Sequence, residues 1–157
     1  MAVTADVQVA CDDPDLPDPN DIQNWITAAI EQSGREPAGN IEVAVRVVDA
    51  DEIRTLNRLY RDKDKPTNVL SFPAGDIEGL PAEEGVMLGD VVVCASIVAA
   101  EAAEQGKALA DHWTHMIVHG TLHLLGFDHE NEPEAVEMEG LEARILASQS
   151  VTDPYAG

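Results

Sequence analysis

Apolar residues alternate or run together in four short segments of the chain, and each segment predicts a β-strand. Residues Ile41–Val48 carry valine or isoleucine at every second position, the pattern of a strand with one buried face. Within Met87–Cys94 three valines follow one another without interruption, so we expect this strand to be buried on both faces. The two shorter predicted strands are Val7–Ala10 and Val69–Phe72.

Between and after these strands, apolar residues recur at the three- and four-residue spacing of amphipathic helices. The first helix begins at Asp18-Pro19, which reads as an N-cap and a first-turn proline. Asp49, with Glu52 three residues later, resembles the capping box of a second helix. Three further helices are predicted over residues 96–105, over residues 111–125 with Asp111 as the N-cap, and after Pro133.

The length of the chain fits one domain, so we expect residues 1–157 to form a single domain with five helices and four strands. Residues 74–86 mix glycine, proline and acidic residues and are predicted to be a loop. We find no internal repeat and no low-complexity tract.

The helix predicted for residues 111–125 is apolar almost all round, except for one stripe that consists of His112, His115, His119 and His123. His119 and His123 are four residues apart, so their rings lie one above the other within reach of one ion. Gly126 can adopt the left-handed conformation that ends a helix, and the turn after it can bring His129 to the same ion. Three neutral imidazoles with an open fourth position are typical of a catalytic zinc-like site.

The other polar residues near these three histidines have ordinary alternatives. We expect His112 to be a packed, hydrogen-bonded core residue. His115, one turn before His119, is either a partner that supports a metal ligand or a packing residue. Asp128, next to His129, either orients a ligand imidazole and handles protons, or is a turn aspartate without another role.

The chain is strongly acidic, with a formal net charge of −21, which argues against a polyanion as its partner. The positive charges are not evenly spread, however. Residues 54–65 hold five of the nine basic residues and two aspartates, a local net charge of +3. These five, which we call the basic island, are Arg54, Arg58, Arg61, Lys63 and Lys65.

The sequence contains no pattern typical of secretion or of a membrane span. Its two cysteines, Cys11 and Cys94, lie far apart in neither a metal-binding nor a redox spacing. We therefore expect a cytoplasmic protein without a membrane partner.

The spacing His-x3-His-x2-Gly-x2-His resembles that of the metzincin peptidases. The residue after the first histidine is Gly120, where those enzymes carry a glutamate as general base. The sequence thus keeps the metal-binding pattern without the peptidase base. A glycine inside a helix costs about 1 kcal/mol relative to alanine, so either a neighbouring strand or the substrate is expected to pack close to the backbone at position 120.

Two longer motifs resemble the YbeY family, bacterial metal-dependent endoribonucleases involved in ribosomal RNA maturation. One runs from Leu56 to Pro73, and the other is His119-Gly-Thr-Leu-His-Leu-Leu-Gly-Phe-Asp-His129. The second motif departs from the family pattern at one fixed position, where Phe127 replaces a tyrosine. The resemblance extends over nearly the whole chain from the second predicted strand onward.

This resemblance implies an α+β fold with a mixed four-stranded sheet and a zincin-like metal-site helix. It implies that His119, His123 and His129 bind one metal ion, and that Arg61 acts on substrate phosphate. Zinc suits three histidines, although nickel or another divalent transition metal would bind the same set. We expect Lys63 and Lys65 to contact substrate too, and Arg54 and Arg58 to form ordinary surface ion pairs.

The function that the resemblance implies is single-strand-specific endoribonucleolytic cleavage in maturation of the small-subunit ribosomal RNA 3′ end and in ribosome quality control. The expected partners are single-stranded ribosomal RNA and the ribosome or small-subunit assembly proteins. Two alternatives stay open: a metalloprotease-like hydrolase of altered mechanism, and a non-catalytic assembly factor with a structural metal. The metal's identity, the cleavage site and the oligomeric state do not follow from the sequence.

Overall fold

The fold was obtained as a computed structural model, which describes residues 3–74 and 86–155. Its strands form one mixed sheet in the order β1-β2-β4-β3, in which β1, β2 and β4 are parallel and β3 is antiparallel to β4. The strands are β1 (Val3–Ala10), β2 (Ile41–Val48), β3 (Val69–Pro73) and β4 (Val86–Cys94). The five helices are α1 (Pro19–Gln32), α2 (Ala50–Arg61), α3 (Ala95–Gln105), α4 (Leu109–Leu124) and α5 (Glu132–Ser148).

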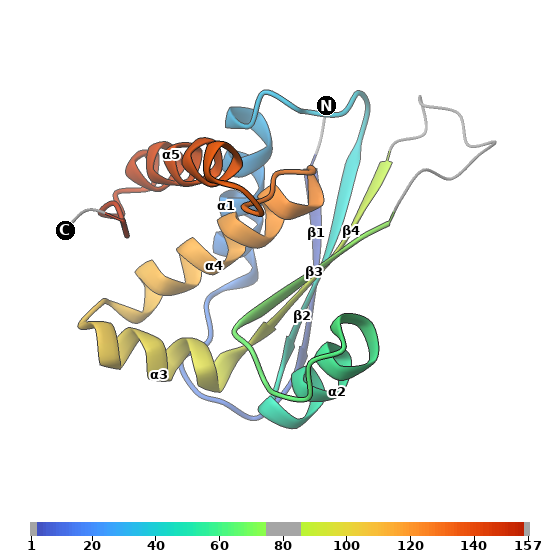
Figure 1. The fold of residues 1–157 in the computed structure, drawn as a ribbon, viewed down its shortest axis with the longest axis vertical. Helices are drawn as coiled ribbons and strands as arrows, with labels where there is room; N and C mark the ends of the chain where they lie inside the picture. Colours follow the sequence, from blue (N-terminus) through green and yellow to red (C-terminus); the bar gives the residue numbers. More distant parts are fainter. Residues whose placement is uncertain (1–2, 75–85, 156–157) are drawn as a thin grey trace.

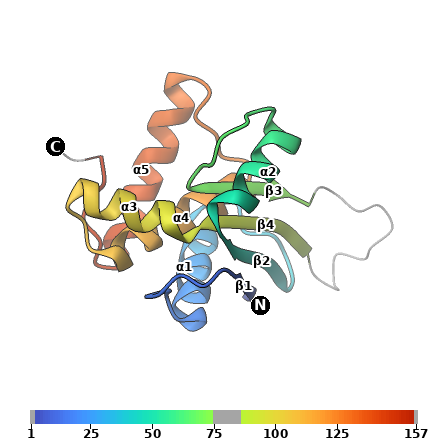
Figure 2. The same cartoon turned by 90° about the horizontal axis from the view of Figure 1, so that it is seen from below.

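The predicted single-domain α+β fold with a mixed four-stranded sheet and five helices is confirmed. The helices α1 and α4 cover one face of the sheet, and α2 covers the other (Figure 1 and Figure 2). The loop predicted for residues 74–86 falls almost entirely outside the described residues.

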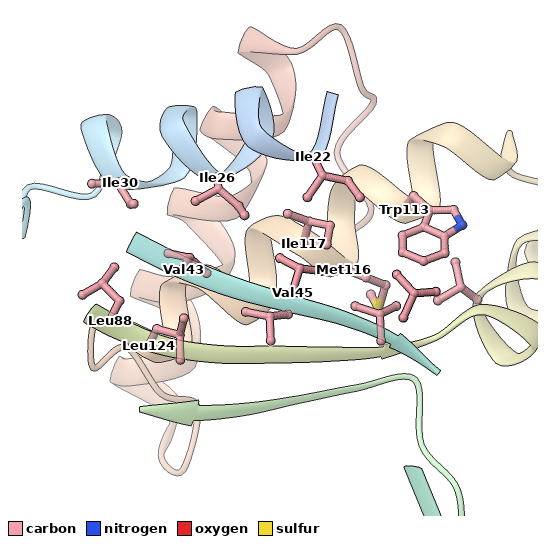
Figure 3. Packing of buried hydrophobic residues seen from close by; sticks show 14 of the residues in the cluster. Ile22, Ile26, Ile30, Val43, Val45, Leu88, Trp113, Met116, Ile117 and Leu124 are labelled. Atoms are coloured by element: carbon pink, nitrogen blue, oxygen red, sulfur yellow. The ribbon is translucent and has the colours of Figure 1, made fainter. Parts of the chain in front are cut away.

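The burial of β4 follows its uninterrupted valines. Val91 and Val93 belong to the core cluster beneath α1 and α4, whereas Val92 and Cys94 pack on the opposite side with Ile53 of α2. The expected burial on both faces is therefore confirmed. In the cluster beneath α1 and α4, isoleucines of α1 meet side chains of α4 above the valines of β2 (Figure 3).

Three elements begin two or more residues earlier than predicted, while the other boundaries that differ do so by one residue. The strand β1 begins at Val3 rather than Val7 and pairs with β2 along its whole length. The helix α4 begins at Leu109, so Asp111 is not its N-cap, since Leu109 packs against the core and lengthens the helix. The helix α5 begins at Glu132, one residue before Pro133, and Asn131 is its N-cap.

The helix α4 is the central element of the fold, because it packs against the sheet on one side and against α5 on the other. Eleven of its sixteen residues are buried, including His112 and His115. The predicted core helix with one polar stripe is thus confirmed, and α4 carries that stripe between the sheet and α5. In the described part of the chain, no helix is long and apolar enough to cross a membrane.

Candidate metal centre and substrate cleft

The last turn of α4 and the loop after it bring three imidazole rings together. His119 and His123 lie on the same side of α4, with their Nε2 atoms 3.1 Å apart. Gly126 has φ +93°, the left-handed conformation expected for the residue that ends the helix. The chain then turns so that the ring centroid of His129 lies 5.8 Å from that of His119 and 5.2 Å from that of His123.

The Nδ1 atoms of His119 and His123 point away from the facing Nε2 atoms, and their hydrogen bonds fix the tautomer of each ring. The Nδ1 atom of His123 lies 2.9 Å from the carbonyl oxygen of Phe127, which only accepts, so this nitrogen is the donor. The Nδ1 atom of His119 lies 2.5 Å from Oε1 of Glu142. If Glu142 is ionised, His119 donates as well, and both Nε2 atoms then carry lone pairs that face each other.

The carboxyl group of Glu142 is ionised at neutral pH. Burial raises the pKa of Glu142, but hydrogen bonds from His115 and His119, the charge that His119 carries when it is protonated, and a hydrogen bond from Tyr155 together lower it to about 2. Burial lowers the pKa of His123, and the charge that His119 carries when it is protonated lowers it further. His123 is therefore not expected to carry a second proton that would link its Nε2 atom to that of His119.

A metal cation fits this arrangement. If both rings are neutral with the proton on Nδ1, two lone pairs face each other at 3.1 Å and repel unless a proton or a metal cation lies between them. Nitrogen ligands about 2.0–2.1 Å from a tetrahedral zinc ion are separated by about 3.3 Å, close to the distance found here. The donor set of neutral imidazoles, oriented by a carboxylate and a carbonyl, is also that of biological zinc sites.

A second group of possible ligands shares His119. In the described residues, ligand atoms of His115, His119 and Glu142 lie within 4.8 Å of one another and can hold a metal ion. The Glu142 side chain is fully buried there and already accepts hydrogen bonds from His115 at 3.2 Å and from Tyr155 at 2.5 Å. A cation in this group would have to replace these hydrogen bonds. On this ground we favour the cleft-facing Nε2 side of His119 as the metal-binding side.

Glu142 and Tyr155 are functional candidates that sequence reasoning missed. Glu142 interrupts the apolar face of α5, which consists of Met138, Leu141, Ile145 and Leu146. A lone carboxylate within a buried helix face was the signal available in the sequence. Tyr155 gave no such signal, because its role depends on the course of the chain after α5. Burial and the neighbouring Glu142 raise the pKa of Tyr155, so its hydroxyl group stays a donor.

His112 and Gly120 behave as expected for structural residues. His112 is 3% exposed, and its Nε2 atom lies 2.9 Å from Oε1 of Glu101. A Cβ atom added at Gly120 would lie 2.8 Å from Val91 Cγ1 and 3.2 Å from Ser71 Oγ. The sheet thus packs directly against position 120, and a glutamate there has no space. This explains why the peptidase base is missing from an otherwise peptidase-like spacing.

The three histidines lie in a cleft of about 780 Å³ that also contains part of the basic island. This cleft runs along the free edge of β3, between the end of α2 and the end of α4. Arg61 lines it and donates from Nη2 to the carbonyl oxygen of Ser71 at 2.7 Å. The other candidates in its lining are Lys63, Lys65 and Asp128.

The remaining candidates lie differently. Asp128 accepts a hydrogen bond from the backbone N–H of His129 at 2.7 Å, as a turn aspartate does. His115 lies behind His119, away from the lining of the cleft, and contacts Glu142. Arg54 forms the ordinary ion pair expected, with Asp64 at 2.9 Å. Arg58 is exposed on α2 and does not line the cleft.

Comparisons with known proteins agree on one family. The family described as Endoribonuclease YbeY matches residues 8–150 of this chain. A Halorhodospira halophila protein named Endoribonuclease YbeY is 57% identical over 139 residues, which covers 88% of each chain. One of the same name from Alcanivorax borkumensis is 49% identical over 156 residues, 98% of this chain and 86% of the relative.

A solved structure supports the fold. The solution structure of a Thermotoga maritima protein aligns with a TM-score of 0.53, covering 96% of this chain and 99% of that one. Its sequence identity is 23%, so this likeness supports the fold alone.

Proposed function

Since this chain belongs to the endoribonuclease YbeY family, we propose that it is a metal-dependent endoribonuclease that hydrolyses phosphodiester bonds of single-stranded RNA in the cleft beside His119. The observation that carries this proposal is the cleft itself, which combines the facing Nε2 atoms of His119 and His123 with Arg61. A cluster of metal-binding imidazoles next to fixed positive charge suits a phosphodiester, whose negative charge increases during hydrolysis.

In this proposal the metal ligands are His119, His123 and His129, and the ion is zinc or another divalent transition metal. When bound, such an ion supplies Lewis-acid chemistry at a phosphoryl oxygen. Glu142 holds His119 in the tautomer that presents Nε2 to the cleft, and the carbonyl group of Phe127 does the same for His123.

Arg61 has the role of a phosphate-binding residue. Its guanidinium group has five N–H donors, and the bond from Nη2 to Ser71 O uses one of them while fixing the side chain at the edge of β3. The other donors remain for phosphoryl oxygens, where charge develops during hydrolysis. Lys63 and Lys65 attract the flanking phosphates, and Asp128 stabilises the turn that places His129.

We place this activity in the cytoplasm, in maturation of the 3′ end of the small-subunit ribosomal RNA and in ribosome quality control. Family membership supports this role, with single-stranded ribosomal RNA and the ribosome or its small-subunit assembly proteins as partners. Sequencing the 3′ ends of small-subunit ribosomal RNA in cells whose only copy carries His119→Ala tests it. Unprocessed ends should accumulate, and normal ends would exclude the role.

The cleavage proposal is tested by incubating purified protein with unstructured RNA and, separately, with casein. We expect cleavage of RNA only, and its loss after chelation or after His119→Ala. Arg61→Ala should lower the cleavage rate while elemental analysis still finds one metal ion per chain. Undiminished RNA cleavage by His119→Ala would refute the proposal.

The two alternatives give different results in these assays. Cleavage of casein would favour a metalloprotease, which the close packing at Gly120 argues against. If the metal is only structural, chelation should greatly lower the thermal stability, and the metal-loaded protein should not cleave RNA.

A further inference from the structure

A second hollow, of about 610 Å³, lies on the other side of the loop that carries Gly126 and Phe127. It is formed between the end of α1 and one face of α5, and its lining includes Arg35, Phe127, Gly140 and Arg144. Phe127 lines both this hollow and the metal cleft. A Cβ atom added at Gly126 would lie 3.3 Å from Nη1 of Arg35, so Arg35 stands directly behind the wall of the cleft.

The charged side chains that line this hollow are Arg35 and Arg144 with one carboxylate, that of Glu137. Only four of the nine basic residues lie outside the basic island, and two of these four, Arg35 and Arg144, line the hollow. The guanidinium group of Arg35 lies 3.7 Å from the centroid of the Phe127 ring and is held by the carbonyl oxygen of Leu125. It also forms a long ion pair of 3.5 Å with the exposed Glu137.

Arg144 differs from Arg35, because its guanidinium group forms no hydrogen bond or ion pair with any residue that the structure describes. The chain has a net charge of −21, so acidic side chains are plentiful, but none of those that the structure describes pairs with Arg144. Its donors are therefore available to a ligand beside the loop that carries His129.

Gly140, between these arginines, has no structural reason to be glycine. It lies within α5, where glycine costs helix stability relative to alanine. A Cβ atom added there would meet no atom of the described residues within 4 Å, so close packing among them does not require a glycine. The missing side chain keeps the floor of the hollow open and lets a ligand approach the backbone of α5.

We propose that this hollow is a phosphate-binding subsite, in which Arg144 and Arg35 bind the RNA strand after it has crossed the Gly126–Phe127 loop from the metal cleft. The inference rests on the proposed endoribonuclease function and extends its substrate path beyond the metal cleft. It predicts that affinity increases with the length of the RNA until the strand reaches both sides of the loop. RNA is favoured over a protein partner because the hollow adjoins the metal cleft and offers guanidinium donors.

Binding of fluorescein-labelled unstructured RNA of about 4 and about 16 nucleotides tests the proposal, by fluorescence anisotropy in a His119→Ala background that leaves the RNA intact. Arg144→Gln should weaken binding of the long RNA about five-fold and that of the short RNA clearly less. It should also reduce the slope of log K against log salt by about 0.7, one single-strand phosphate contact. The matched control is Arg58→Gln, which removes the same charge from an exposed position outside both hollows.

Gly140→Gln provides a second test that does not depend on charge. It fills the hollow with a good helix former, so the melting temperature should rise while the long RNA binds more weakly. Ala147→Gln, exposed on the same helix outside the hollow, is its control. If Arg144→Gln and Gly140→Gln bind the long RNA as their controls do, the subsite is refuted and a protein ligand becomes the better occupant. Undiminished cleavage by the His119→Ala background would instead refute the underlying nuclease proposal, whatever the hollow binds.

Discussion

The buried carboxylate of Glu142 should make the metal-free protein sensitive to acid, and Glu142→Gln should remove that part of the sensitivity. The side chain is fully buried and accepts hydrogen bonds from His115, His119 and Tyr155. Its pKa falls from 4.5 to about 2 on folding, because these hydrogen bonds outweigh the cost of burial. Below pH 4.5 the unfolded chain therefore binds a proton at this position that the folded chain does not.

The magnitude follows from linkage. A group whose pKa is lowered on folding stabilises the protein fully above its unfolded pKa, and this stabilisation is lost as the pH falls towards the folded pKa. One pKa unit corresponds to about 1.4 kcal/mol, so Glu142 should contribute about 3 kcal/mol at neutral pH. About 1.4 kcal/mol of this should be lost at pH 3.5, and nearly all of it near pH 2.

The assay is urea denaturation of metal-free wild type and Glu142→Gln at several pH values between about 6 and about 3. Glutamine keeps the shape of the side chain and an oxygen that accepts from His119, but it does not titrate. The difference between the two unfolding free energies should therefore shrink as the pH falls, whereas Glu104→Gln on the exposed face of α3 should run parallel to wild type. Parallel curves for wild type and Glu142→Gln would refute the reasoning.

Three further changes test other parts of the structure. Gly120→Glu should destabilise the protein by about 3 kcal/mol in thermal or urea unfolding, because the sheet already fills the position, and should create no activity on casein. Phe127→Tyr should change stability and metal affinity by less than about 1.5 kcal/mol, since the backbone carbonyl rather than the ring holds His123; a large loss of affinity would contradict this. The RNA cleavage rate should first rise with added salt, as the repulsion between RNA and a chain of charge −21 is screened, and then fall as the contacts in the cleft weaken. A steady fall from the lowest salt concentration would show that the acidic surface does not affect association.

The predictions that succeeded rest on local rules. The spacing of His119 and His123 depends only on helix geometry, and the left-handed turn at Gly126 depends on the conformational freedom of one residue. The basic island was visible as a cluster of charge in the sequence. Its division was also expected, and Arg54 does form an ordinary ion pair, with Asp64 ten residues away, while Arg61 is held at the edge of β3.

The features that sequence reasoning missed depend on contacts between distant segments. Glu142 meets His119 across 23 residues, and Tyr155 meets His115 across 40 residues. No local pattern specifies which buried carboxylate faces which imidazole. The start of α4 shows the same limit, since the packing of Leu109 against the core outweighed the capping preference of Asp111.

The position of the cleft explains how an acidic chain can act on RNA. The cleft lies at the free edge of β3, where the end of α2 supplies cations from one face of the sheet and α4 supplies imidazoles from the other. At about 0.1 M salt, charges more than about 10 Å apart are largely screened, so the many distant carboxylates weaken binding much less than their number suggests. The cations within the cleft act at contact distance and are screened far less. Under the proposed function, the same surface would oppose general RNA binding while the cleft would bind a strand that enters it, so access to the edge of β3 would determine which RNA is cut.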